Sequence, residues 1–164
     1  MTDRATRMST LWTQVLAAGA AAIVVAVLGS TMTDIGPWYQ SLEKPSFQPP
    51  DWLFGPAWTL IFALAALAGV TAWRAADGVS REWIIALFAI NGTLNVLWTV
   101  LFFRLQRPDW ALIEVVFLWL SVLALLIYLG RFSKLAGALI VPYLLWVAFA
   151  GLVNYQIVLL NGPF

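Results

Sequence analysis

The stretch WYQSLEKPSFQPPDWLFGPAW, from Trp38 to Trp58, separates two long apolar runs and decides how the chain must fold. It contains four prolines and three tryptophans, together with the charged residues Glu43, Lys44 and Asp51. Charged side chains are costly in hydrocarbon and proline interrupts a continuous helix, so this stretch cannot itself cross a bilayer. The pattern predicts a polar connection with a membrane-spanning helix on either side of it.

The composition places the rest of the chain in a membrane. Of 164 residues, 62% are hydrophobic and 10% are charged, whereas a soluble domain carries about 25% charged residues. These runs do not alternate apolar and polar residues, as the strands of a β-barrel would. We therefore expect an all-α membrane protein with one domain over residues 1–164, a five-transmembrane-helix bundle. Each apolar run is near the length of about 20 residues that spans a bilayer, and the runs cover residues 11–31, 54–73, 83–103, 110–130 and 135–160.

The first run could instead be a signal peptide, because Arg4 and Arg7 precede it. The apolar region of a signal peptide is only about 7–15 residues long, so the length of this run favours a retained span. Lysine and arginine collect on the cytoplasmic side of membrane proteins. Six of the nine basic residues fall on the side of the N-terminus, and the three others are Lys44, Arg104 and Arg107. We expect a cytoplasmic N-terminus, an outer C-terminus and, for a helical bundle, the inner membrane of a bacterium.

The connection over residues 32–53 is several times longer than the other connections. Long loops on a compact bundle are usually functional or disordered, and the aromatic residues of this one favour an ordered segment. We expect a lid folded over the outer end of the bundle. The alternative is a loop that only anchors the protein at the level of the lipid headgroups.

The chain has no histidine and no cysteine, which narrows its chemistry. Disulfides, zinc and iron–sulfur sites, Cys or His nucleophiles and the usual haem ligands all require these residues. We therefore expect no metal site, no resident cofactor and no conventional catalytic constellation. The net charge of +1 offers no basic surface for nucleic acid.

Polar and aromatic residues gather in the outer halves of the spans, beneath the loop. At about 1.5 Å per residue, Trp58 lies about 9 Å and Trp98 about 7 Å below the outer boundary, and Trp146 lies roughly at mid-membrane. Such a set indicates a pocket for a flat, largely apolar ligand. The alternative is that the asparagines only join helices by hydrogen bonds. Three helical faces carry these residues: Trp58, Phe62, Ala65 and Gly69 on the second run, Asn91, Asn95, Trp98 and Phe102 on the third, and Tyr143, Trp146, Ala150 and Asn154 on the fifth.

Glu114 lies about one turn below the outer interface and is a lone acid in its span. It could reach headgroup water, or pair with Arg104 or Arg107 at the nearby helix end. A proton relay would need further acids deeper in the spans, and the sequence has none there. This argues against an ion pump or an ion-coupled transporter.

The motifs NVLWTVLFF, WALIE and VPYLLWVAFAGLVNY, together with the opening stretch, resemble the tryptophan-rich sensory protein/translocator protein (TspO/MBR) family, also called peripheral-type benzodiazepine receptors. The resemblance runs from about Trp38 to Asn161. It implies a five-helix bundle that is often a homodimer and binds porphyrins such as protoporphyrin IX; some members bind cholesterol and benzodiazepine-type drugs. By position it implies ligand-binding roles for Tyr39, Pro49, Trp58, Asn95, Trp98, Trp146 and Ala150. The helical faces on the third and fifth runs add Asn91, Tyr143 and Asn154 as secondary residues.

Two departures from the family pattern bear on the ligand. The cholesterol motif proposed for animal members needs a basic residue after its tyrosine, and none follows Tyr155 here. Phe47 stands where relatives often have tryptophan, a change that keeps an aromatic surface.

We expect a membrane receptor or sensor that binds a porphyrin in the aromatic pocket and acts in tetrapyrrole transport or regulation. Lys44, Arg104 and Arg107 would meet the propionates at its opening. One alternative is light- and oxygen-dependent degradation of the porphyrin, with Trp58 and Trp146 as the oxidisable side chains.

A further alternative is a non-catalytic scaffold that binds membrane lipid. The small-residue spacings Ala65/Gly69 and Ala68/Ala72 would let helices approach closely, either within the bundle or between two copies.

Overall fold

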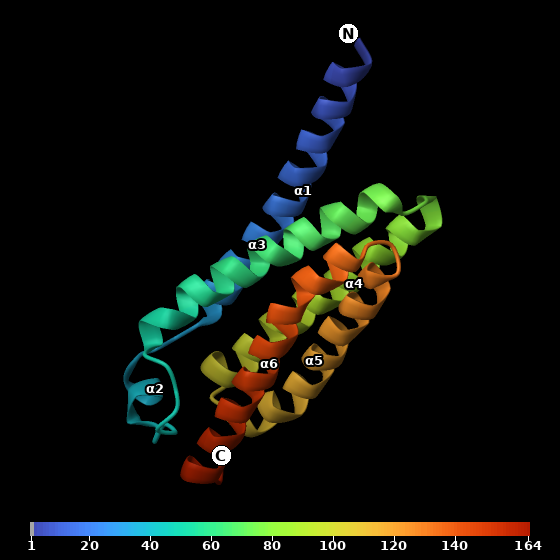
Figure 1. The fold of residues 1–164 in the computed structure, drawn as a ribbon. Coiled ribbons are helices and arrows are strands. Elements are labelled where there is room, and N and C mark those ends of the chain that lie inside the picture. Colours follow the sequence, from blue (N-terminus) through green and yellow to red (C-terminus); the bar gives the residue numbers. More distant parts are fainter. Residues whose placement is uncertain (1) are drawn as a thin grey trace.

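The structure, a computed structural model, describes the backbone of residues 2–164 and the side chains from Trp12 onward. Five helices in this part of the chain are long and apolar enough to cross a membrane, which confirms the predicted all-α membrane bundle. The side chains of Arg4 and Arg7, which entered the orientation argument, lie outside the described residues. The helices are α1 (Thr2–Met32), α3 (Asp51–Ala75), α4 (Gly78–Thr99), α5 (Pro108–Gly130) and α6 (Lys134–Asn161), with the short α2 (Pro37–Ser41) between α1 and α3 (Figure 1).

Local sequence sets where the helices begin. Proline opens both α2 and α5, at Pro37 and Pro108, where its missing N–H costs nothing because the first helical N–H has no intrahelical partner. Asp77 caps α4 by accepting a 2.9 Å hydrogen bond from the Ser80 N–H. Hydrogen bonds from the Ser80 side chain, and then from its backbone N–H, lower the pKa of Asp77. Ser133 caps α6 in the same way. Serine and aspartate are favoured at this position because their side chains satisfy a free backbone donor.

Helices α5 and α6 share the most extensive contact in the bundle, and α6 also packs on α3. A Cβ atom added to Gly137 would lie 3.1 Å from the Gly130 Cα atom, so the two backbones touch where these glycines meet. Between helices in a membrane, such close packing supplies much of the attraction. The fully buried side chains along this contact include Val122, Leu125, Leu129, Ile140 and Val147.

The small-residue spacings on α3 are used inside this one chain. Ala65, Ala68 and Ala72 are buried in the main core, and a Cβ atom on Gly69 would lie 3.1 Å from the ring of Phe88 on α4. Of the two uses that the spacings allowed, the structure therefore realises packing within the bundle.

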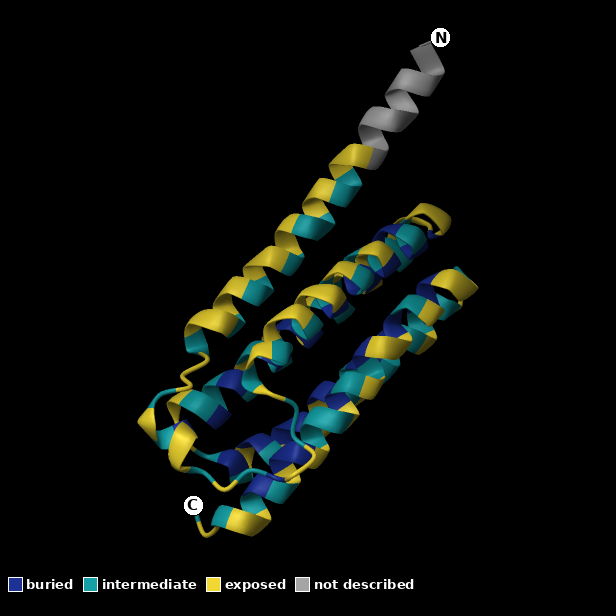
Figure 2. Ribbon diagram, turned by 60° about the vertical axis from the view of Figure 1, so that its left-hand side comes forward, coloured by how far each residue is buried: buried dark blue, intermediate teal, exposed yellow. Residues whose placement is uncertain are grey.

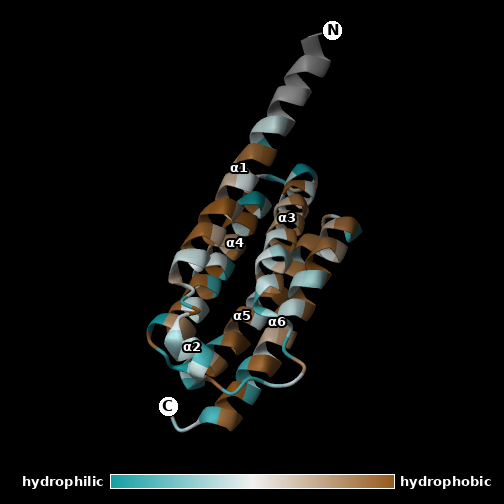
Figure 3. Ribbon diagram, turned by 90° about the vertical axis from the view of Figure 1, so that its left-hand side faces the viewer, coloured by the Kyte–Doolittle hydropathy of each residue, from teal (hydrophilic) through white to brown (hydrophobic). Residues whose placement is uncertain are grey.

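The two ends of the bundle differ. One, called here the loop end, carries residues 33–50, the α4–α5 link and the C-terminus, while the opposite end carries the α3–α4 and α5–α6 links (Figure 1). Buried positions face the inside of the bundle and exposed ones its outside (Figure 2). Hydrophobic residues dominate the helices between the two ends, and hydrophilic residues are concentrated toward the links (Figure 3). The apolar surface of the helices between the two ends is the part that a lipid bilayer covers.

Helix α4 continues into a π-helical turn, η1 (Val100–Arg104). The Leu105 N–H donates to the Val100 carbonyl at 2.9 Å, a bond one residue longer than in an α-helix. Successive residues of an α-helix point about 100° apart, and the wider turn lets Phe102 and Phe103 both lie against Trp98, with centroid distances of 5.2 and 6.2 Å.

The connection over residues 33–50 is held to the loop end by contacts at several points. The Asn161 side chain donates to the Glu43 carbonyl at 2.9 Å and accepts from the Glu43 N–H at 2.7 Å. On α2, the Trp38 ring meets Phe102 edge to face at 6.0 Å. The loop therefore lies across the ends of α4 and α6.

Candidate functional site

Six aromatic side chains line the contact between α3 and α6 in the half of the bundle nearer the loop. We call this set the aromatic seam; its members are Phe54, Trp58, Phe62, Tyr143, Trp146 and Phe149. On each helix they recur every three or four residues, which places them on one face. The Trp58 ring stacks on Phe62 at 5.2 Å and meets Trp146 edge to face at 6.5 Å and Tyr143 at 5.9 Å.

The rings of the seam contact one another at Trp58 and Trp146, two of the residues predicted to line a pocket. Centroid separations of about 4.5–7 Å are those of aromatic rings in contact, and every pair cited above falls in that range. A flat ligand at this place would have to part Trp58 from Trp146. The seam is therefore a closed contact between two helices that a ligand would have to open.

Tyr143 links the seam to the polar residues of α4. Its hydroxyl donates to the Asn91 Oδ1 atom at 3.0 Å and accepts from the Asn95 Nδ2 atom at 3.3 Å. Asn91 in turn donates from Nδ2 to the Ser121 hydroxyl on α5 at 2.9 Å. These bonds join three helices through buried polar groups, so the helix-joining role considered for Asn91 and Asn95 is realised.

A second polar chain lies nearer the loop end. The Trp98 Nε1–H donates to the Asn154 Oδ1 atom at 3.2 Å, and the Asn154 Nδ2 atom donates to the Pro108 carbonyl at 2.9 Å. Asn154 is almost fully buried. It thus fastens α6 to both α4 and the start of α5.

Two buried polar groups beside these chains have no partner among the described residues. The Trp146 Nε1–H finds no acceptor, and both Glu114 carboxyl oxygens accept no hydrogen bond. Buried indole N–H groups usually have a partner, so Trp146 presents a donor that a bound molecule could use. Of the alternatives for Glu114, pairing with Arg104 or Arg107 is not seen in this part of the chain.

Tyr39, the predicted ligand residue from the loop, is buried and tied to the start of α3. Its hydroxyl donates to the Asp51 Oδ1 atom at 3.0 Å and accepts from the Gln48 Nε2 atom at 3.1 Å. Burial, then the hydrogen bond and negative charge of Asp51, raise the pKa of Tyr39 to about 12, against a smaller lowering by Gln48. The Lys44 Nζ atom lies 3.9 Å from the Tyr39 ring centroid and 3.7 Å from Asp51.

The remaining predicted residues lie at the edges of the site. Pro49 is half-buried in the loop, and Ala150 is half-buried on α6, one turn beyond Trp146. Phe47 packs edge to face on Phe149 at 6.3 Å, so the loop reaches the seam.

The predicted residues fall into two groups. Asn91, Asn95, Trp58, Tyr143 and Trp146 meet at the seam, whereas Trp98, Asn154 and Tyr39 belong to the neighbouring contacts of η1 and the loop. Sequence reasoning missed Phe54, Phe149 and Ser121. The aromatic spacing relative to Trp58 and Trp146 could have revealed the first two.

The three basic residues expected at the opening are already engaged. Lys44 pairs with Asp51, Arg104 donates to the Thr31 carbonyl, and Arg107 pairs with Asp109 and lies over the Trp110 ring at 4.1 Å. Their charges lie at the loop end.

Comparison with known proteins gives one consistent set of matches. A sequence model of the TspO/MBR family matches residues 15–160. A "Tryptophan-rich protein TspO" from Archaeoglobus fulgidus is 39% identical over 145 residues, covering 87% of this chain and 93% of that protein. A protein of the same name from Chlorobaculum tepidum is 40% identical over 85% of this chain and 90% of its own length. The "Translocator protein" of Bos taurus is 33% identical over 73% of this chain and 72% of its own.

Proposed function

The chain belongs to the TspO/MBR family of membrane sensor and translocator proteins, and from that premise we propose that it binds a porphyrin, such as protoporphyrin IX, between α3 and α6. The observation that carries the proposal is the Trp146 indole N–H, which is buried in a seam of aromatic rings with no acceptor among the described residues. A ligand with ring nitrogens or carboxylates supplies such an acceptor, and its flat face suits aromatic stacking.

Binding would proceed by opening the seam. Parting Trp58 from Trp146 exposes the faces of two indoles, and a porphyrin inserted there replaces ring–ring contacts with contacts of the same kind. The propionates would point to the loop end, where Lys44 and Arg104 place positive charge. The loop, through Phe47 on Phe149, would act as the lid.

The test is quenching of tryptophan fluorescence by protoporphyrin IX, titrated on the purified protein in the dark. We expect saturation at about one porphyrin per chain, as one seam admits one ligand, and loss of saturable quenching in Trp58→Phe/Trp146→Phe. The matched control is Trp12→Phe/Trp83→Phe, which removes two indoles that are 59% and 58% exposed and lie outside the seam. Non-saturable quenching, equal in all three proteins, would mean that porphyrin only partitions into the micelle.

A second candidate function is light-dependent degradation of the bound porphyrin, because the edge contact between Trp58 and Trp146 places two oxidisable indoles where the ligand would lie. Porphyrin absorbance should then fall only with light and oxygen, and more slowly in Trp58→Phe/Trp146→Phe. Equal bleaching by empty micelles would contradict this activity.

The proposal includes an orientation and an assembly. The loop end would face outside, since six of the nine basic residues fall on the other side. The helical bundle favours a bacterial inner membrane. A homodimer would use lipid-facing surfaces, because Ala65, Ala68 and Ala72 are already buried within one chain. Crosslinking in native membranes tests the dimer.

A further inference from the structure

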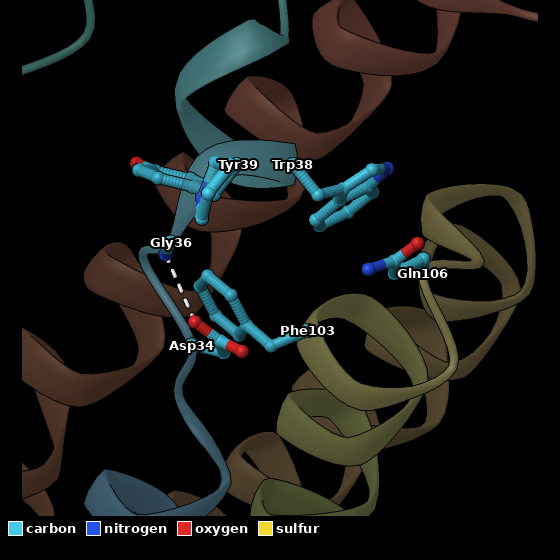
Figure 4. Close-up of a pocket in the computed structure, with 7 residues that line it drawn as sticks. Asp34, Gly36, Trp38, Tyr39, Phe103 and Gln106 are labelled. Atoms are coloured by element: carbon cyan, nitrogen blue, oxygen red, sulfur yellow. Dashed lines mark hydrogen bonds between the residues drawn. The ribbon is translucent and has the colours of Figure 1, made fainter.

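A separate cavity of about 180 Å³ lies at the loop end, between the loop and the α4–α5 link. We call it the loop-end cavity. In Figure 4, Trp38 and Tyr39 of α2 lie along one side, Phe103 and Gln106 lie across from them, and Asp34 lies beside Phe103. Since one water occupies about 30 Å³ of liquid, the cavity has room for a small organic group. Tyr39 is the one lining residue that is also a predicted porphyrin-binding residue, and no lining residue belongs to the aromatic seam.

We propose that the loop-end cavity binds an organic ammonium group. A carboxylate beside aromatic rings is the arrangement that recognises such cations, because the ring faces attract positive charge and the carboxylate accepts its N–H donors. Asp34 supplies the carboxylate, and Trp38 and Phe103 supply rings.

Next to the cavity, an ammonium group of the protein itself is bound by an aromatic ring and a carboxylate. The Lys44 ammonium lies 3.9 Å from the Tyr39 ring centroid and 3.7 Å from the Asp51 carboxylate. Because Lys44 already lies over Tyr39, we assign the ligand's cation to Asp34, Trp38 and Phe103.

The basic side chains at the loop end bind other partners, so the Asp34 carboxylate can bind a cationic ligand. Lys44 pairs with Asp51 and Arg107 pairs with Asp109, while Arg104 donates to a backbone carbonyl. Among the described residues, no basic side chain forms an ion pair with Asp34. Its Oδ1 atom accepts a 2.9 Å hydrogen bond from the Gly36 N–H, which fixes the direction of the carboxyl group (Figure 4).

Gln106 gives a further indication from the opposite side of the cavity. Its φ is +53°, the one positive φ of a non-glycine residue in the described backbone. This left-handed conformation is disfavoured for a residue with a Cβ atom, and such backbone strain clusters at ligand sites. Here it presents the Gln106 side chain to the cavity (Figure 4).

The test is ligand-observed NMR with ethylammonium, using the full chain in phosphatidylglycerol nanodiscs and an amine-free buffer. We expect saturable binding that is about tenfold weaker in Asp34→Asn, the loss that one charge-assisted hydrogen bond produces. Asparagine at this position keeps an acceptor for the Gly36 N–H, so the local turn is retained. Phe103→Leu, which keeps apolar volume but removes a ring, should also weaken binding.

The matched control is Glu43→Gln, which removes an exposed acid from the same loop but outside the cavity. It should bind as the wild type does. Equal binding by Asp34→Asn and the wild type, equal losses in the Asp34 and Glu43 variants, or no saturable binding at all would each overturn the proposal. Porphyrin quenching is measured separately, so the two proposals fail independently.

The ammonium group could belong to a lipid headgroup or to a soluble amine. Replacing part of the phosphatidylglycerol with phosphatidylethanolamine distinguishes them. A lower apparent affinity for ethylammonium would confirm the site and identify the lipid headgroup as its occupant. Unchanged affinity would confirm the site for a soluble amine.

Discussion

The indole of Trp58 on α3 meets the indole of Trp146 on α6 edge to face, with ring planes at 87° and centroids 6.5 Å apart. This contact closes the seam, yet the Trp146 N–H within it has no acceptor in the described part of the chain. A buried donor without a partner costs about 1–3 kcal/mol. The contact therefore combines good ring packing with one unfavourable polar group, which ligand binding would relieve.

Replacing Trp146 by Phe removes that donor and keeps a ring. We expect the free energy of unfolding to change by less than about 1 kcal/mol, because the relieved N–H offsets the lost apolar area. Porphyrin affinity should fall by about tenfold, the loss of one hydrogen bond of about 1.4 kcal/mol. Trp83→Phe, at an exposed position of α4, should change neither quantity. Unchanged porphyrin affinity in Trp146→Phe would show that the Trp146 N–H does not contribute to porphyrin binding.

Tyr143→Phe deletes the hydroxyl that bonds Asn91 and Asn95. In membrane proteins such hydrogen bonds contribute about 0.6 kcal/mol each, so we expect a loss of about 1 kcal/mol in the free energy of unfolding, measured by denaturant titration in mixed micelles. Tyr155→Phe provides the control, because Tyr155 is 46% exposed on the same helix. Equal stabilities of the two variants would show that the Asn91–Tyr143–Asn95 bonds contribute nothing.

Tyr39 should titrate above the ordinary tyrosine pKa of about 10, because burial and Asp51 raise its pKa to about 12. A raised pKa means that the folded state favours the neutral phenol. The stabilisation is therefore complete below about pH 10 and is lost as the pH rises to about 12. The difference in tyrosinate absorbance between the wild type and Tyr39→Phe isolates this group. A difference curve centred near pH 10 would contradict the buried contact with Asp51.

The absence of cysteine allows a direct test of orientation. Ser46→Cys places a thiol in the loop, and Val79→Cys places one at the opposite end; both positions are exposed. With the loop end outside, a membrane-impermeant maleimide should label Ser46→Cys in intact spheroplasts and Val79→Cys only after lysis. The reverse pattern would invert the orientation.

The sequence predicted the membrane bundle because the length and apolarity of a run are enough to identify a spanning helix. It did not predict the π-helical turn at η1. Reading a helical face assumes about 100° per residue throughout, and that assumption hides the wider turn that brings Phe103 as well as Phe102 onto Trp98.

For the site, depth and helical face were enough to group Trp58 with Trp146 and Asn95 with Tyr143. They could not tell whether the rings would leave a gap or interlock, because that depends on side-chain rotamers and on how closely α3 approaches α6. The sequence also could not identify Ser121 as the partner of Asn91. Ser121 is a single hydroxyl residue in an apolar run, and its position beside Asn91 depends on how α4 packs on α5.

The two hydrogen bonds between the Asn161 side chain and the Glu43 backbone affect how fast the loop can open. Hydrogen bonds attach the middle of the loop to the end of α6, and the Tyr39–Asp51 hydrogen bond attaches the loop to the start of α3. Opening the loop must break at least one of these attachments, whereas affinity depends on the seam beneath. The residence time of a molecule bound in the seam would then depend on Asn161, which lies outside the seam, and its exchange would be faster in a variant without this attachment while the equilibrium affinity stayed the same.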